Sequence, residues 1–218
     1  MSSRRQVLKQ LVAMGALAGL SALPRAQAAT PEAKASAVGR YHMPDEAGPQ
    51  ARVWVAFGAS RDIWGRNYKD VQATIGRLVQ AMAPHTEVNV LCREEEEALA
   101  RQLCGEQNTR FIVAELDDIW LRDTGGVFVR NGEGELGLVD FNFNGWGDKQ
   151  EHEQDGGVAE WVSTQADAHY LQSRLTGEGG GIEVDGKGTA ILTESCWLNG
   201  NRNPGLSKAQ VEAELKVN

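Results

Sequence analysis

The sequence predicts an α/β fold, on three observations. Along residues 52–114, short apolar runs alternate with segments whose apolar residues recur at helical spacing, which is typical of alternating strands and helices. Hydrophobic residues make up 41% of the chain and charged residues 24%, which is ordinary for a globular domain. Most of the 25 glycines follow residue 124, so we expect turns and close backbone approaches in the second half.

The first half is expected to contain three strands and two helices. Residues 52–57 have the sequence RVWVAF, a mostly apolar run typical of a buried strand. Val71, Ile75 and Val79 recur at helical spacing, and Pro84 ends that helix. The predicted strands are 52–57, 87–91 and 111–114, and the predicted helices are 70–82 and 94–103.

The second half is expected to be richer in turns. Short strands are predicted at 127–129, 136–141, 182–184 and 189–193, with a hairpin turn at Asp185-Gly186 between the last two. Residues 142–160 are polar and glycine-rich and are predicted as a long loop, followed by a helix at 166–175. Ser207 and Gln210 have capping-box spacing, so a final helix is predicted from there to Asn218.

Residues 1–28 have the features of an export signal. Paired arginines come first, an apolar run of about 13 residues follows, and an Ala-x-Ala sequence closes the segment. Paired arginines are typical of the bacterial twin-arginine route, which predicts a periplasmic or secreted protein. The apolar run is too short for a stable membrane anchor. We expect a linker at 29–40 and one domain at 41–218.

The charge of the chain excludes several classes of partner. The formal net charge is −8, and all four charged residues of the first 29 are basic; without these, 18 basic side chains remain against 30 acidic ones. A domain so acidic is a poor partner for nucleic acid or an anionic membrane, whereas it suits a cationic ligand. The sequence favours neither a monomer nor an oligomer.

The cysteines and histidines predict no metal site. Cys92, Cys104 and Cys196 lack the close pairing of zinc ligands, and no two of the four histidines have metal-site spacing. We interpret the cysteines as free thiols, with a disulfide between Cys92 and Cys104 as the alternative in an oxidising compartment.

Three segments carry residues suited to chemistry. Residues 117–125, with the sequence DDIWLRDTG, combine carboxylates, an arginine and a tryptophan directly after a predicted strand. A carboxylate can accept two parallel N–H bonds from a guanidinium while an indole stacks on the planar cation. The alternative is that Arg122 pairs with Asp118 or Asp123 and only stabilises a turn.

The other two segments are glycine-rich. Residues 140–147, DFNFNGWG, form either a ligand-binding wall or a loop anchored by its aromatic rings. Residues 177–186, GEGGGIEVDG, allow a close backbone approach around Glu178, or form a plain turn. The segment lacks the Gly-Lys-Ser/Thr ending of a phosphate loop.

Taken in order, these segments resemble agmatine deiminases and the related bacterial peptidyl-arginine deiminases. The matching stretches lie within residues 41–216 and are MPDE, DIWLRDTG, FNGWG, EGG, TESCWLN and RNP. The resemblance implies a pentein fold, an α/β propeller of five ββαβ-like units around a central site. It also implies hydrolysis of a guanidinium to a ureido group with release of ammonia, and no metal or organic cofactor.

The resemblance assigns roles to residues of the first segment. Asp118 corresponds to the aspartate that binds the substrate guanidinium. Trp120, Arg122 and Asp123 correspond to neighbours that shape the substrate-binding site.

Two later residues also have counterparts in the family. Trp146 corresponds to the loop tryptophan that lines the pocket, and Glu178 to a catalytic glutamate that pairs with the guanidinium or supports the catalytic histidine. The family's Gly-His-x-Asp segment and late nucleophilic cysteine have no counterpart before Asn218, and Cys196 matches a non-catalytic position. We therefore expect this chain to be C-terminally truncated and inactive.

The substrate that the resemblance implies is a small guanidinium cation. Agmatine, converted to N-carbamoylputrescine for putrescine biosynthesis, is the first choice, and peptidyl-arginine, converted to citrulline, is the second. The alternative is an exported protein that binds guanidinium compounds without cleaving them.

Overall fold

The computed structural model describes residues 40–216. The predicted export signal (1–28) and the linker up to residue 39 lie outside them. The described residues fall within one compact unit. In this described part, no helix is long and apolar enough to cross a membrane.

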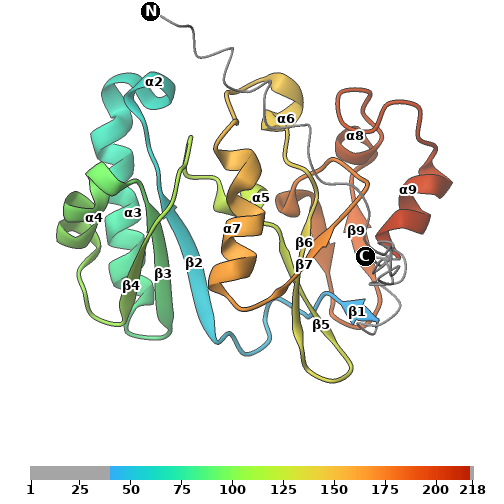
Figure 1. The fold of residues 1–218 in the computed structure, drawn as a ribbon, viewed down its shortest axis with the longest axis horizontal. Coiled ribbons are helices and arrows are strands. Elements are labelled where there is room, and N and C mark those ends of the chain that lie inside the picture. The colour runs from blue at the N-terminus through green and yellow to red at the C-terminus, as the bar shows by residue number, and fades with distance from the viewer. Residues whose placement is uncertain (1–39, 217–218) are drawn as a thin grey trace, which may run out of the picture. The chain divides into compact units, whose positions relative to one another are not determined.

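The first sheet has the order β2-β3-β4 and is parallel. Its strands are β2 (Arg52–Phe57), β3 (Glu87–Cys92) and β4 (Thr109–Val113). The connecting helices α3 (Tyr68–Met82) and α4 (Glu97–Cys104) pack against each other. Side chains of both helices bury one face of the sheet around Phe57, Val79 and Val90. The predicted alternation of strand and helix is thereby confirmed (Figure 1).

The second sheet has the order β1-β5-β6-β7 and is mixed. Its strands are β1 (Tyr41–His42), β5 (Val127–Asn131), β6 (Leu136–Asp140) and β7 (His169–Gln172). β5 pairs antiparallel with β1 and β6, whereas β7 pairs parallel with β6. A third, antiparallel pair is formed by β8 (Ile182–Val184) and β9 (Ala190–Leu192).

Helix α7 (Val158–Gln165) joins the two main sheets. Its residues Val158, Ala159 and Val162 pack in one cluster with Leu91 of the first sheet and Leu138 of the second. Since this cluster holds residues of both sheets, segments at the ends of either sheet have fixed positions relative to each other.

The short helices occupy the connections. They are α2 (Arg61–Trp64), α5 (Leu121–Thr124), α6 (Gly145–Asp148), α8 (Glu194–Trp197) and α9 (Lys208–Leu215), with 3-10 turns at Gly65–Asn67, Glu94–Glu96, Asp155–Gly157 and Gly179–Gly181. The capping box of α9 is present, since Ser207 and Gln210 each bond the other's backbone N–H. That part of the sequence prediction is confirmed.

Two sequence predictions are wrong. Residues 142–160 are not one loop, because α7 begins at Val158 and its buried residues have helical spacing. Residues 166–175 do not form a helix, since β7 (His169–Gln172) lies in the middle of this segment. Its half-buried side chains carry little periodic signal, and β7 is defined by backbone pairing with β6, about thirty residues away. The α/β class itself is correct, and the three sheets of residues 40–216 stay separate.

Candidate functional site

Three predicted site residues follow the carboxyl ends of strands: Asp118 follows β4, Trp146 follows β6 and Glu178 follows β7. Trp64, which the sequence analysis did not single out, follows β2 in the same way. Because parallel strands present their carboxyl ends at one edge, residues that follow them converge there. Figure 1 shows α2 and α6 at the same end of the two sheets.

Asp118 is almost completely buried, with 1% of its surface exposed. The indole N–H of Trp64 donates to Oδ1 of Asp118 at 2.6 Å, and the side-chain amide of Gln150 donates to Oδ2 at 3.1 Å. Each oxygen thus accepts one bond, and a carboxylate has about four lone-pair sites. The carboxylate is therefore fixed in orientation and can still accept further N–H donors.

The backbone around Asp118 is held against the end of β2. A Cβ at Gly58 would overlap the backbone carbonyl of Asp118, so only glycine allows this approach. The guanidinium of Arg93 donates to the carbonyls of Leu116 at 2.8 Å and Ala59 at 3.3 Å. These contacts place the segment after β4 beside the segment that leads into α2.

Aromatic rings form a wall next to the aspartate. Trp120 stacks on Trp64, with ring centroids 6.2 Å apart and planes at 28°. Trp146 meets Trp120 edge-on at 6.2 Å and Phe143 edge-on at 5.0 Å. Trp120 keeps 43% of its surface exposed. An indole that neighbouring rings hold in place, and that is partly exposed to solvent, is suited to stacking by a planar cation.

The segment carrying Trp146 has an uncommon backbone. Positive φ angles occur at Asn142, Gly145, Trp146, Gly147 and Asp148. For a bulky residue such as Trp146, with φ 57° and ψ 33°, this conformation is strained and persists where surrounding contacts hold it. One such contact is the side chain of Asn144, which accepts the N–H of Gly147 at 2.9 Å.

Asp123 joins two of the predicted segments. Its carboxylate accepts the indole N–H of Trp146 at 3.2 Å and the backbone N–H of Gly180 at 3.1 Å. A Cβ at Gly179 would overlap the carbonyl of Arg122, and one at Gly180 would overlap Asp123. The glycines after Glu178 thus allow a close backbone approach, which here is to the protein's own chain.

Arg122 lies apart from this set. Its guanidinium forms an ion pair with Glu46, and both side chains are about half exposed. Of the two partners considered from the sequence, Asp118 is held by Trp64 and Gln150 instead. The distant Glu46 carries no local sequence signal for this pairing.

Glu178 forms a buried ion pair with Arg202. Nε of Arg202 lies 2.6 Å from Oε1 of Glu178, and both side chains are 7% exposed. A Cβ at Gly147 would overlap Asn201 and Arg202, so Arg202 lies between Glu178 and the turn that carries Trp146. The ion pair fixes the position of the glutamate side chain.

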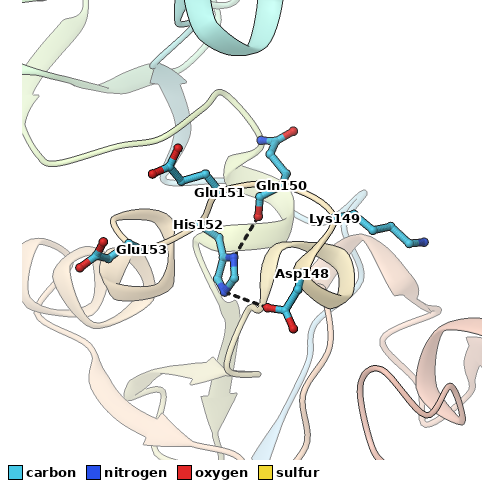
Figure 2. A pocket seen from close by; sticks show the side chains of 6 residues that line it. All are labelled: Asp148, Lys149, Gln150, Glu151, His152 and Glu153. Carbon is cyan, nitrogen blue, oxygen red and sulfur yellow. Dashed lines mark hydrogen bonds and ion pairs between the residues drawn. The ribbon is translucent and has the colours of Figure 1, made fainter.

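Residues 148–153, from the end of α6 onward, line an open hollow of about 550 Å³. Figure 2 shows that His152 lies among them, with its Nδ1 3.0 Å from the carbonyl of Gln150 and its Nε2 3.9 Å from a carboxylate oxygen of Asp148. Its ring also meets Phe143 edge-on at 6.2 Å. Lys149 and Glu151 point away from the histidine.

The described cysteines are free. Burial raises the pKa of Cys92 and of Cys104 to about 11, so both stay protonated near neutral pH and are poor nucleophiles. Cys196 packs against the cluster that contains Trp197. Within residues 40–216, no three His, Cys, Asp or Glu side chains are grouped as metal ligands.

Sequence reasoning missed three residues of this arrangement: Trp64, Gln150 and Arg202. Trp64 and Gln150 stand outside the conspicuous motifs, and only the fold brings them to Asp118. Arg202 belongs to the RNP stretch that carried part of the resemblance. Its place in that stretch was the sequence signal that could have identified it as a site residue.

Comparisons with known proteins agree with this architecture. The profile of the Porphyromonas-type peptidyl-arginine deiminases matches residues 42–218. The agmatine deiminase of Pseudomonas putida strain F1 is 38% identical over 187 residues, covering 81% of this chain and 50% of that protein. The agmatine deiminase of Stutzerimonas stutzeri is 37% identical over 187 residues, with coverage of 81% and 50%.

A solved structure of an agmatine deiminase shows the same similarity. The agmatine deiminase of Enterococcus faecalis superposes with a TM-score of 0.76 at 31% identity, covering 80% of this chain and 49% of that one. The chain spans about half the length of the curated relatives it matches. Given the matched profile and the identity to these relatives, the chain belongs to the Porphyromonas-type peptidyl-arginine deiminase family.

Proposed function

We propose that this chain supplies the guanidinium-binding part of a deiminase. The observation that carries the proposal is Asp118, a buried carboxylate held on both oxygens, whose partner Trp64 stacks on the partly exposed Trp120. A guanidinium can donate to the remaining lone pairs of Asp118 while its plane stacks on the indole. Both contacts favour a flat cation over an ammonium, which presents a compact point charge.

The proposed reaction is hydrolysis of the guanidinium carbon–nitrogen bond. Water adds at that carbon, one nitrogen leaves as ammonia, and a ureido group remains. In the family that the sequence resembles, a cysteine thiolate and a histidine perform the covalent and proton-transfer steps. We assign these two roles to no residue of this chain; its own residues bind and orient the substrate.

Agmatine is the proposed substrate, because relatives that share 37–38% identity are agmatine deiminases. The product would be N-carbamoylputrescine, an intermediate in putrescine formation. Peptidyl-arginine is the second choice, supported by the family profile. We also propose a pentein-type arrangement, and export through the signal at residues 1–28, which cell fractionation would test.

Titration calorimetry of the full chain with agmatine, arginine and putrescine tests the binding role. We expect agmatine to bind and putrescine, which lacks the guanidinium, to bind far more weakly. Asp118→Asn should abolish agmatine binding, whereas Asp70→Asn, at an exposed position on α3, should leave it unchanged. Equal binding of agmatine and putrescine, or unchanged binding by Asp118→Asn, would overturn the proposal.

An ammonia assay on the same samples separates catalysis from binding. Ammonia release from agmatine would contradict the expectation that this chain is inactive. Agmatine binding without ammonia release is the result expected both of the guanidinium-binding part of a deiminase and of a non-catalytic guanidinium-binding protein.

A further inference from the structure

The segment that carries Asp118 is fastened to the segment that carries Gln150 by a reciprocal pair of aspartates. The backbone N–H of Asp117 donates to Oδ1 of Asp155 at 2.9 Å. In return, Oδ2 of Asp117 accepts the backbone N–H of Gln154 at 2.8 Å and that of Asp155 at 3.0 Å. We call this arrangement the aspartate clasp.

The clasp links the site to the rigid core. Asp155 begins the 3-10 turn Asp155–Gly157, which continues directly into α7. The first residue of α7, Val158, is packed in the cluster that joins the two main sheets. Asp117 precedes Asp118 in the chain, so a position fixed at Asp117 constrains the carboxylate that follows it.

Burial of the Asp155 carboxyl group is energetically unfavourable. It is 1% exposed, and its Oδ2 has no hydrogen-bond partner among the described residues. Burial raises the pKa of Asp155 to about 6, and the nearby charges of Asp117 and Asp118 act in the same direction, while the N–H bond from Asp117 lowers it. Carboxyl groups perturbed in this way occur preferentially at functional sites.

We propose that Asp155 is a positioning residue for Asp118. Through the clasp it sets the separation between the segment after β4 and the segment that carries Gln150, and so aims the Asp118 carboxylate at the guanidinium. The identity of that ligand rests on the proposed function. Leu116 and Val158 already pack in one core cluster, and the clasp adds the direct hydrogen bonds that join the two segments next to Asp118.

Two substitutions at Asp155 distinguish its role as a hydrogen-bond acceptor from the effect of its negative charge. Asp155→Ala removes the acceptor of the Asp117 N–H, whereas Asp155→Asn retains an oxygen there and removes the ionisation. We expect Asp155→Ala to weaken agmatine binding about tenfold, which corresponds to about 1.4 kcal/mol. Asp155→Asn should restore most of the affinity at neutral pH and flatten its pH dependence between pH 5 and 7.

Affinity and melting temperature, measured on the same variant, distinguish positioning from a merely structural role. A structural role would lower the melting temperature of Asp155→Ala and leave the affinity of the folded protein unchanged. Wild-type affinity in folded Asp155→Ala would therefore overturn the proposal. Asp70→Asn serves as the charge-matched control, since Asp70 is exposed on α3.

A ligand-free measurement decides the proposal even where agmatine fails to bind, an outcome that would contradict only the proposed function. In nitrogen-15 NMR spectra, the indole N–H of Trp64 and the side-chain amide of Gln150 report on Asp118 directly. Both resonances should move in Asp155→Ala and stay near the wild-type positions in Asp155→Asn. The Asp117 amide should titrate with a midpoint of about 6 in the wild type alone. Unmoved Trp64 and Gln150 signals in Asp155→Ala would refute the positioning role.

Discussion

The indole nitrogen of Trp64 lies 2.6 Å from Oδ1 of Asp118, across 54 positions of sequence. The same indole ring stacks on Trp120. One side chain therefore orients the buried carboxylate and supports the aromatic surface beside it. The proposed binding geometry for a guanidinium therefore depends on a residue that belongs to none of the motifs singled out in the sequence.

Trp64→Phe tests this dual role. Phenylalanine keeps an aromatic ring against Trp120 but cannot donate to Asp118. We expect agmatine affinity to fall about tenfold, since a hydrogen bond to a charged group contributes roughly 1.5–3 kcal/mol before other donors compensate. Calorimetry measures the change. Trp161→Phe, on the exposed side of α7, is the matched control and should bind as the wild type; equal affinity in the two variants would contradict the assignment.

Loss of Arg202 should destabilise the fold strongly. Arg202→Met leaves the buried carboxylate of Glu178 without its cation, and breaking such a pair costs about 3 kcal/mol or more. Urea unfolding measures the difference. Because the penalty comes from the unpaired charge, the double variant Arg202→Met with Glu178→Gln should be more stable than Arg202→Met alone. Equal stability of these two would show that the ion pair is not the source.

Gly147 and Gly134 allow backbone strain to be separated from crowding. Both have positive φ angles, 84° and 86°, so alanine at either position costs about 1–2 kcal/mol in backbone energy. Open space surrounds Gly134, whereas a Cβ at Gly147 would overlap Asn201 and Arg202. Gly147→Ala should therefore lose clearly more unfolding free energy than Gly134→Ala, and should also weaken agmatine binding by displacing Trp146.

Stability should depend on pH through Asp155. Its pKa in the folded protein is raised to about 6, above the value of about 3.9 expected for an unfolded chain. Between these values the folded state binds more protons, so the free energy of unfolding falls as pH rises from about 4 to about 6 and then levels off. Urea unfolding across this range should show a fall on the order of 3 kcal/mol in the wild type. Asp155→Asn should lack that component; an identical pH profile would rule out Asp155 as its cause.

Local patterns explain which elements could be predicted. Strands β2 and β3 and helix α3 carry continuous or periodic apolar residues, so their positions follow from the sequence alone. Strand β7 has half-exposed side chains and depends on parallel pairing with β6. Such pairing is set by tertiary contacts, which a local window does not contain.

The residues of the site divide in the same way, into those that a local pattern predicts and those that only tertiary contacts bring together. The segment from Asp118 to Asp123 was conspicuous because unusual residue types stand close together. The donors that hold Asp118 come from α2 and from the segment after α6, each more than thirty positions away. Their chemistry is ordinary, and only the convergence of strand ends gives them a role at the site.

The tryptophan row also has an optical consequence. Trp64, Trp120 and Trp146 follow one another with centroid separations of 6.2 Å, a range in which the electronic transitions of neighbouring indoles couple. Coupled transitions give circular dichroism bands that depend on the angle between the rings. The three tryptophans therefore act as an intrinsic probe. A cation that binds on Trp120, or a small rotation of the Trp146 ring, would change the circular dichroism spectrum of the unlabelled protein.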